Sequence, residues 1–244
     1  MKDVKYEQIS DGVKIAQDSR GLLLTTDACL LSAFVNRNAK QTVCELGAGS
    51  GIISAMLLLS KKIKSSVCVD FQPDICALAE ENAKRNGLSD RMTVVCADVN
   101  VYDSDKRFDT VVSNPPYFKA EDGKKNESEQ NRLTRHETTA AITDFAKCAS
   151  RILKDGGNAY FCYTPQRLSE LLCALSSSGL EPKTLVTVYP TMKHKPSLVL
   201  VSAKKGAQGG IVCERPLFIY KDKAGGEYTD DYLRIKKENR WSLK

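Results

Sequence analysis

Residues 42–51, T-V-C-E-L-G-A-G-S-G, give the clearest indication of the fold class of this chain. The apolar run Thr42–Leu46 indicates a short strand, and the segment from Gly51 to Lys62 indicates a helix. Glycines between them allow a sharp turn and let a ligand approach more closely than a Cβ atom would permit. In a doubly wound sheet this first strand-to-helix turn lies at the carboxyl ends of the strands, where ligands bind. We therefore expect a ligand-binding loop here.

Strand and helix patterns alternate along the chain after this loop. Further strands are expected at Ser66–Asp70, Met92–Ala97, Phe108–Ser113, Asn158–Tyr163, Val186–Tyr189 and Leu198–Ala203. Helices are expected from Pro73 to Gly87, from Ile142 to about Leu153 with a stop at Gly156-Gly157, and from Pro165 to Ser178. This alternation is typical of an α/β fold in which helices cover both faces of a parallel sheet.

The segment before the loop has a different pattern. Residues 6–17 predict two short strands around a turn at Ser10-Asp11-Gly12. Thr25, Thr26 and Asp27 can cap a helix whose apolar side chains share one face. These side chains are Leu30, Leu31 and Phe34. The polar run 119–135, K-A-E-D-G-K-K-N-E-S-E-Q-N-R-L-T-R, predicts a loop without core residues.

Composition indicates an ordinary globular chain. Of its 244 residues 42% are hydrophobic and 27% are charged. No apolar run approaches the roughly 20 residues of a membrane span. The amino-terminal M-K-D-V-K-Y-E-Q-I-S lacks the apolar core of a signal peptide, so we expect a cytoplasmic protein without membrane association.

The nine cysteines do not indicate disulfides or a metal site. Their number is odd, no C-x-x-C pair occurs, and the chain has only two histidines. Cys44, Cys68 and Cys96 lie in predicted strands, where a buried cysteine acts as a small hydrophobic residue. We expect structural thiols and no bound metal.

Two acidic residues follow the glycine-rich loop at informative positions. Position 52 is isoleucine, so the third glycine of the dinucleotide fingerprint G-x-G-x-x-G is missing. Asp70 ends the second predicted strand, where a carboxylate can accept hydrogen bonds from ribose hydroxyls. Asp98 follows the third strand and can accept a hydrogen bond from an adenine amino group.

The most specific signal is V-V-S-N-P-P-Y at residues 111–117, where an apolar strand ends at Asn114. Proline fixes φ and restricts the preceding residue, so Asn114 and Pro115 are held extended. An exocyclic amino nitrogen on adenine or an amide is a poor nucleophile because its lone pair is conjugated. Hydrogen bonds from that NH2 group to the Asn114 side-chain oxygen and the Pro115 carbonyl would free the lone pair. Tyr117 can stack on a flat substrate ring.

At these residues the chain resembles the bacterial tRNA-valine adenine-N6-methyltransferase family along nearly its whole length. The segments that carry the resemblance are Q-x8-T-T-D-A-C-L-L from Gln17, E-L-G-A-G-S-G, S-N-P-P-Y-F, R-H-E from Arg135, L-K-D-G-G, V-x-P with the lysines after it, and P-L-F-I-Y…G-E-Y-T-D. The chain departs from the family at Thr25-Thr26, where members commonly carry an aromatic residue and serine.

The resemblance implies a class I methyltransferase (Rossmann-like) fold, with a seven-stranded, mostly parallel sheet, helices on both faces and a reversed final hairpin. It implies S-adenosyl-L-methionine as methyl donor and tRNA as acceptor. The division expected is a hairpin-and-helix extension at residues 1–40 and a methyltransferase domain at 41–244. The catalytic residues implied are Asn114, Pro115, Pro116 and Tyr117. The cofactor contacts expected are Glu45, Gly47, Ala48, Gly49, Gly51, Asp70, Phe71, Asp98 and Asn114.

Positive charge suggests how RNA would bind. The net charge is +6, and residues 183–205 hold five lysines without an acidic residue. We hypothesise that these lysines, the basic carboxyl terminus and the 119–135 loop surround the cleft. The substrate contacts expected are Tyr117, Lys119, Arg135, His136, Lys193 and Lys195. For His136 we favour a structural or substrate-positioning role, since the proton can leave after methyl transfer. We expect no obligate protein partner and a monomer or weak dimer.

Three other functions remain open on the sequence. Asn-Pro-Pro-Tyr also occurs in protein glutamine-N5 methyltransferases, although their longer amino-terminal domain has little room before residue 42. Guanine-N2 methyltransferases of rRNA share a similar element. A non-catalytic RNA-binding protein on a methyltransferase fold is the alternative of a different class. Loss of Asn114 or of the glycines would favour it, and neither is lost.

Overall fold

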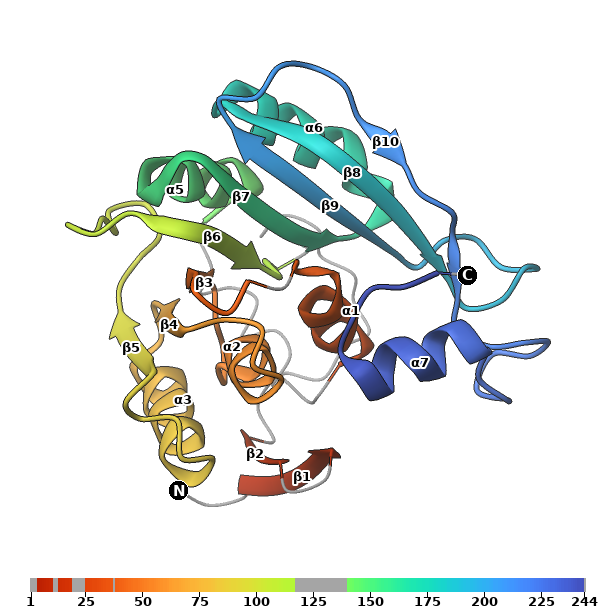
Figure 1. The fold of residues 1–244 in the computed structure, drawn as a ribbon, viewed down its shortest axis with the longest axis horizontal. Coiled ribbons are helices and arrows are strands. Elements are labelled where there is room, and N and C mark those ends of the chain that lie inside the picture. Colours follow the sequence, from red (N-terminus) through yellow and green to blue (C-terminus); the bar gives the residue numbers. More distant parts are fainter. Residues whose placement is uncertain (1–3, 11–12, 19–24, 37, 117–139, 244) are drawn as a thin grey trace, which may run out of the picture.

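The computed structural model describes residues 4–10, 13–18, 25–36, 38–116 and 140–243. Their largest element is a nine-stranded sheet with the order β10-β8-β9-β7-β6-β3-β4-β5, to which β11 adds beside β8 (Figure 1). The strands are β3 Thr42–Leu46, β4 Ser65–Asp70, β5 Met92–Cys96, β6 Phe108–Ser113, β7 Leu153–Tyr163, β8 Leu180–Tyr189, β9 Leu198–Lys205, β10 Val212–Cys213 and β11 Leu217–Phe218. In the described residues no helix is long and apolar enough to cross a membrane.

Strand direction confirms the mostly parallel sheet. β3 pairs in parallel with both β4 and β6, and β7 continues in parallel beside β6. Among the described strands of this sheet only β9 is reversed: it runs antiparallel between β7 and β8, as the expected final hairpin requires. Seven strands form the expected sheet, and the two-residue strands β10 and β11 extend it beyond β8.

Helices cover both faces of the sheet (Figure 1). They are α1 Thr26–Phe34, α2 Ile52–Leu59, α3 Pro73–Arg85, α5 Ile142–Ile152, α6 Leu168–Ser177 and α7 Asp230–Glu238, with a short 3-10 turn at Pro165–Arg167. One core cluster joins α1, α2, α3 and α7, and the other joins α5 and α6. Neighbouring strand residues alternate between them: Val111 belongs to the second core and Val112 to the first. This alternation follows from the two-residue period of a strand, so both faces of the sheet are buried.

Most predicted elements are confirmed within a few residues, and the differences have local causes. The helix expected to stop at Gly156-Gly157 ends at Ile152, because the chain enters β7 at Leu153 and passes the glycines inside the strand. Helix α7 was not predicted. Thr229 caps it, with its side-chain oxygen 3.2 Å from the Tyr232 nitrogen, so a capping signal was present in the sequence.

The amino-terminal elements also match their prediction. β1 Val4–Ser10 and β2 Val13–Asp18 pair antiparallel as a separate two-stranded sheet. Thr25 caps α1 by accepting a hydrogen bond from the Ala28 nitrogen at 3.3 Å. Helix α1 is buried in the same core as α2. The division into two parts at residue 40 stays a prediction.

The cysteine prediction is correct at two strand positions and wrong at a third. All nine cysteines are free, and Cys44 and Cys68 are fully buried. Cys96 is exposed. It ends β5, the strand at the edge of the sheet, so fewer neighbours cover it than cover the two central positions.

A buried lysine joins the end of the chain to the first helix. Lys62 is 3% exposed, and its Nζ donates to the carbonyl oxygens of Ser32 at 2.7 Å, Ala33 at 2.9 Å and Asn239 at 3.1 Å. Asn239, directly after α7, also accepts from the Ser32 hydroxyl and donates to the Met56 carbonyl. Helix ends leave carbonyl groups without partners, so this contact satisfies carbonyls of both α1 and α7.

Replacing Lys62 with methionine tests this contact. The substitution keeps the apolar stem but removes the donor for three carbonyls, so the free energy of unfolding should fall by about 3 kcal/mol. The exposed Lys64→Met substitution, two residues away, should change it by less than about 0.5 kcal/mol. Urea titration measures both. Equal stability of the two variants would mean that Lys62 does not hold the carboxyl-terminal helix.

Candidate active site

In the glycine-rich turn between β3 and α2, glycines adopt a left-handed backbone conformation that other residues rarely adopt. Gly47 has φ +64°, and a Cβ atom there would lie 3.1 Å from a ring carbon of Phe145 on α5. Gly51 has φ +72°, and a Cβ atom there would lie 2.3 Å from the Met92 methyl carbon. Both the left-handed conformation and the close neighbours therefore favour glycine.

The same turn is anchored from three sides. The Ala48 nitrogen donates to the Val69 carbonyl at 3.0 Å, and the Gly49 nitrogen donates to Asp70 Oδ2 at 2.9 Å. Asn82, fully buried on α3, donates its side-chain Nδ2 to the Ser50 carbonyl at 2.8 Å. Sequence reasoning missed Asn82, since an asparagine inside a helix carries no motif. The turn is thus preformed.

Glu45 lies at the base of the turn and caps the amino end of α2. The Glu45 side chain is buried, and Oε2 accepts from the Ser54 nitrogen at 2.8 Å, in the first turn of α2. Gly51 precedes that helix without a side chain to cap it, so Glu45 does so from β3. Burial raises the pKa of Glu45 to about 7, although the hydrogen bonds from Ser54 oppose the shift. A direct contact with the cofactor stays a prediction for this residue.

The two aspartates lie at the ends of the neighbouring strands. Asp70 accepts from Gly49 through Oδ2 and from the Gln72 nitrogen through Oδ1 at 3.1 Å. Burial raises its pKa, against the opposing effect of these backbone hydrogen bonds. A carboxylate oxygen can accept more than one hydrogen bond. Phe71 beside it is 37% exposed.

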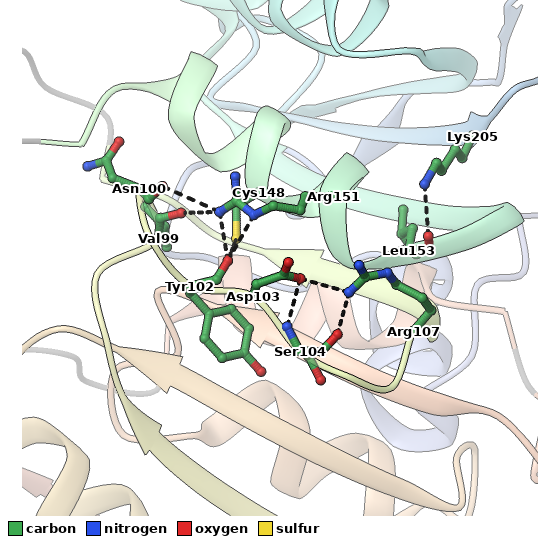
Figure 2. A network of polar contacts seen from close by, with 10 residues as sticks. All are labelled: Val99, Asn100, Tyr102, Asp103, Ser104, Arg107, Cys148, Arg151, Leu153 and Lys205. Carbon is green, nitrogen blue, oxygen red and sulfur yellow. Dashed lines mark hydrogen bonds and ion pairs between the residues drawn. The ribbon is translucent and has the colours of Figure 1, made fainter.

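Asp98 begins a tight turn after β5, and Figure 2 draws Val99, Asn100 and Tyr102 of this turn. The Asp98 carbonyl accepts from the Val101 and Tyr102 nitrogens, and its Oδ1 accepts from both nitrogens of Asn100 at 2.8 and 2.9 Å. Asp98 is exposed, so the turn depends on contacts from other elements to keep its position.

Arg151 on α5 gives that support. Its guanidinium donates to the Val99 carbonyl at 2.9 Å and to the Tyr102 carbonyl at 2.7 and 3.0 Å (Figure 2). The Cys148 thiol lies 3.8 Å from the same Tyr102 oxygen. The same guanidinium also reaches the Asn100 carbonyl at 3.5 Å, so one rigid fork of donors holds three carbonyls of the turn. Sequence reasoning missed Arg151 because a basic residue in the last turn of a helix is ordinary.

The end of β6 lies against the glycine-rich turn. Ser113 pairs in register with Leu46, and its hydroxyl donates to the Leu46 carbonyl at 2.8 Å. Asn114 follows directly and is half-buried, Pro115 is buried and Pro116 is exposed. The structure thus brings the predicted catalytic strand end beside the predicted cofactor loop. Tyr117, Lys119, Arg135 and His136, like the 119–135 loop, lie outside the described residues.

The lysines expected around the cleft separate into two groups. Lys193 and Lys195 are on the loop after β8, at the same end of the sheet as Asn114, where the parallel strands terminate. Lys183, Lys204 and Lys205 lie toward the opposite end of the sheet, since Lys205 pairs with Leu180 at the start of β8. The hypothesis that they surround the cleft is therefore wrong for these three lysines.

Comparison with known families identifies the family of this chain. Residues 24–171 match the methyltransferase small domain family. The chain belongs to this family. A methyltransferase of this kind takes its methyl group from S-adenosylmethionine, so the glycine-rich turn and its aspartates are the candidate cofactor site.

Similar proteins extend the match beyond this domain. A tRNA1(Val) (adenine(37)-N6)-methyltransferase from Actinobacillus pleuropneumoniae serotype 7 is 27% identical, over 91% of this chain and 92% of its own length. Proteins of the same name from Vibrio campbellii and Bacteroides fragilis strain YCH46 are 23% and 26% identical, over 97% and 91% of this chain and 95% and 92% of their own lengths.

Solved structures share the fold. A protein from Agrobacterium tumefaciens described as a predicted O-methyltransferase has a TM-score of 0.68 and 21% identity, covering 90% of this chain and 98% of that one. TYW2 from Pyrococcus horikoshii, in complex with MeSAdo, has a TM-score of 0.59 and 15% identity, covering 84% and 72%. Both support a class I methyltransferase fold.

The raised pKa of Glu45 predicts a specific dependence of stability on pH. Its pKa is about 7 in the fold against an ordinary value of 4.5, so the folded state binds the proton more tightly. The resulting stability is present below pH 4.5 and is lost as pH rises toward 7. Relative to Glu45→Gln, the wild-type free energy of unfolding should fall by about 3 kcal/mol across that window. Denaturant titrations at several pH values measure this, with the exposed Glu214→Gln as control; parallel profiles for wild type and Glu45→Gln would contradict it.

The Arg151 contact predicts an effect on cofactor binding. Arg151→Met removes the guanidinium donor from three carbonyls of the Asp98 turn, so the Kd for S-adenosylmethionine should rise about tenfold. Arg151→Lys should restore part of the affinity, and kcat at saturating cofactor should change less than about twofold. The matched control is Arg107→Gln, which removes a surface ion pair with Asp103 in the same segment. Calorimetry and steady-state kinetics measure these effects; a fall in kcat without a change in affinity would refute the positioning role.

Proposed function

We propose that this protein transfers the methyl group of S-adenosylmethionine to N6 of an adenine in tRNA. The observation that carries the proposal is the position of Asn114, which follows β6 directly beside the glycine-rich turn. The similar proteins from three bacteria, each aligned over at least 91% of this chain, bear the name of that activity. We extend the proposal to adenine 37 of tRNA1(Val), the position in their name, and to action in the cytoplasm.

The described residues fit the cofactor. The glycine-rich turn presents its backbone beside the Asp70 carboxylate, which supports a cofactor site at this turn. We assign the ribose hydroxyls to Asp70 and the adenine amino group to Asp98, with Phe71 beside the ring. We assign the remaining contacts to Gly47, Ala48, Gly49, Gly51, Asn114 and, through the support of α2, Glu45. When bound, S-adenosylmethionine supplies a methyl group that a nitrogen lone pair can attack.

Asn114 and Pro115 activate the acceptor by accepting hydrogen bonds. The adenine NH2 group donates to the Asn114 side-chain oxygen and to the Pro115 carbonyl, which draws its lone pair out of conjugation with the ring. Two fixed acceptors at this point stabilise the positive charge that develops on the nitrogen. The extra proton then leaves to water, so no strong base is required. Pro116 keeps the segment rigid, and we assign to Tyr117 stacking on the base.

The target adenine has to leave its stack to reach this position. We therefore propose that the base is unpaired or is turned out of the RNA when it binds. Lys119, Arg135 and His136 are proposed to hold the nucleotides around it, with His136 as a positioning residue. Affinity should depend steeply on salt, since lysine and arginine contacts with phosphates release counterions.

The deciding experiment is transfer of labelled methyl from S-adenosylmethionine to total tRNA of a strain that lacks the gene. The RNA is digested and its nucleosides are identified by mass spectrometry. N6-methyladenosine should appear. Asn114→Ala should lower kcat by about a hundredfold or more, because it removes a fixed acceptor in the transition state. Its Kd for S-adenosylmethionine should change less than about twofold.

Asn38→Ala provides the matched control, because Asn38 is exposed and lies in the connection before β3, at the end of that strand away from the site. It should keep full turnover. Label in rRNA or in a release-factor glutamine, with none in tRNA, would replace the proposed acceptor by one of these. Equal loss of turnover and of cofactor affinity in Asn114→Ala would show that the catalytic element is misplaced.

A further inference from the structure

The loop between β8 and β9, residues 190–197, is a basic loop. It projects from the end of the sheet at which the site lies. Its sequence is P-T-M-K-H-K-P-S, which holds two lysines and no acidic residue. β8 is parallel to β11 and antiparallel to β9, which is itself antiparallel to β7. The end of β8 therefore points the same way as the ends of β6 and β7, and Figure 1 shows this loop extending outward beyond β8.

The shape of the β8–β9 loop is fixed by a buried threonine. Thr191 is 1% exposed, and its Oγ1 lies 2.7 Å from His194 Nδ1 and accepts from the Lys193 nitrogen at 3.2 Å. The His194 nitrogen donates to the Thr191 carbonyl, and the Ser197 nitrogen donates to the Val188 carbonyl at the base of the loop. The loop is a folded turn, so little entropy is lost when it binds a partner.

The other side of the loop base is held by the carboxyl-terminal segment. The Ile219 nitrogen donates to the Tyr189 carbonyl at 2.9 Å, and the Tyr220 nitrogen donates to the Pro190 carbonyl at 2.8 Å. Because Thr191 is buried and the backbone at the base of the loop is paired, the side chains at positions 192–195 are exposed. Lys193 and Lys195 point away from the core, and Met192 between them and the buried threonine is 78% exposed.

This loop is displaced sideways from the catalytic strand. From β6 to β8 the order is β6, β7, β9, β8, which is three strand spacings. At about 4.8 Å per spacing the displacement is roughly 14 Å. A base held at Asn114 does not reach so far, but a polyanion that continues beyond that base does. Ammonium groups on a preformed turn suit phosphate oxygens, which they bind as point charges.

We propose that the β8–β9 loop docks on the phosphates of the paired RNA stem adjoining the target adenine's loop. This inference rests on the proposed function for the identity of the RNA. Lys193 and Lys195 contact the phosphates, Met192 packs against the sugar edge, and Thr191 is a positioning residue. The loop thereby supplies affinity for folded RNA while Asn114 and Pro115 supply the chemistry.

Two double variants, each removing two lysines from one end of the sheet, test this docking. The double variant Lys193→Gln with Lys195→Gln should weaken binding of a stem-loop RNA about tenfold, and should reduce the slope of log K against log salt by about 2. The matched control is Lys183→Gln with Lys204→Gln, which removes the same charge from the opposite end. It should change neither quantity. Filter binding across a salt series measures both.

Two further arms separate docking from other effects. A single-stranded oligonucleotide that has only the sequence of the RNA loop should bind both double variants with equal affinity, because it lacks the stem. Thr191→Val keeps the charge and the shape of the side chain but removes the hydroxyl. It should weaken stem-loop binding about threefold, with the wild-type salt slope.

Several outcomes would overturn the inference. Equal losses in the two double variants would indicate a general charge effect, and a loss on the oligonucleotide as well would place the β8–β9 loop over the target base. Unchanged binding in the Lys193 and Lys195 variant would exclude RNA as the partner of this loop. Failure of the proposed function is seen separately: the wild type would bind the stem-loop without methylating its adenine.

Discussion

Parallel pairing of β3 with both β4 and β6 sets the geometry of the whole site. Because the three strands run in the same direction, the residues after them meet at one edge. The chain reaches β4 through α2 and returns to β6 from the other side, so the strand order reverses at β3. That reversal opens the crevice in which an α/β sheet binds its ligand. The glycine-rich turn, Asp70 and Asn114 lie near one another at this point because the strands that carry them are neighbours.

Irregular segments and helix ends of this fold are held by side chains that donate hydrogen bonds to backbone carbonyls. Asn82 holds the glycine-rich turn, Arg151 holds the turn after β5, and Lys62 joins α1 to the end of α7. A turn cannot pair its own carbonyl groups as a helix or sheet does, so each needs a donor from elsewhere. These donors come from α3, from α5 and from the connection before β4. The site is therefore rigid at its base, and its chemistry can rest on position more than on reactive groups.

The reversed strand β9 has a consequence for substrate binding. Inserted antiparallel between β7 and β8, it makes β8 run in the direction of the catalytic strands. The loop after β8 consequently lies at the site edge, while the lysines at the start of β8 and the end of β9 lie away from it. Two-residue strands β10 and β11 and the helix α7 then brace β8 from outside. The carboxyl-terminal part of the chain thus carries the proposed RNA-docking loop on a sheet built for the cofactor.

Local patterns in the sequence were enough to predict the alternation of strands and helices, the glycine-rich turn and the strand ending at Asn114, and through them the family. Alternation of apolar residues, glycine between strand and helix, and proline after asparagine each act over a few neighbouring positions. Only the folded chain reveals that Arg151 supports the Asp98 turn, that Lys62 reaches Asn239 at a separation of 177 residues, and which lysines share the site edge. Those contacts depend on strand order and direction. No local pattern encodes them, because the partners approach only after the sheet has assembled.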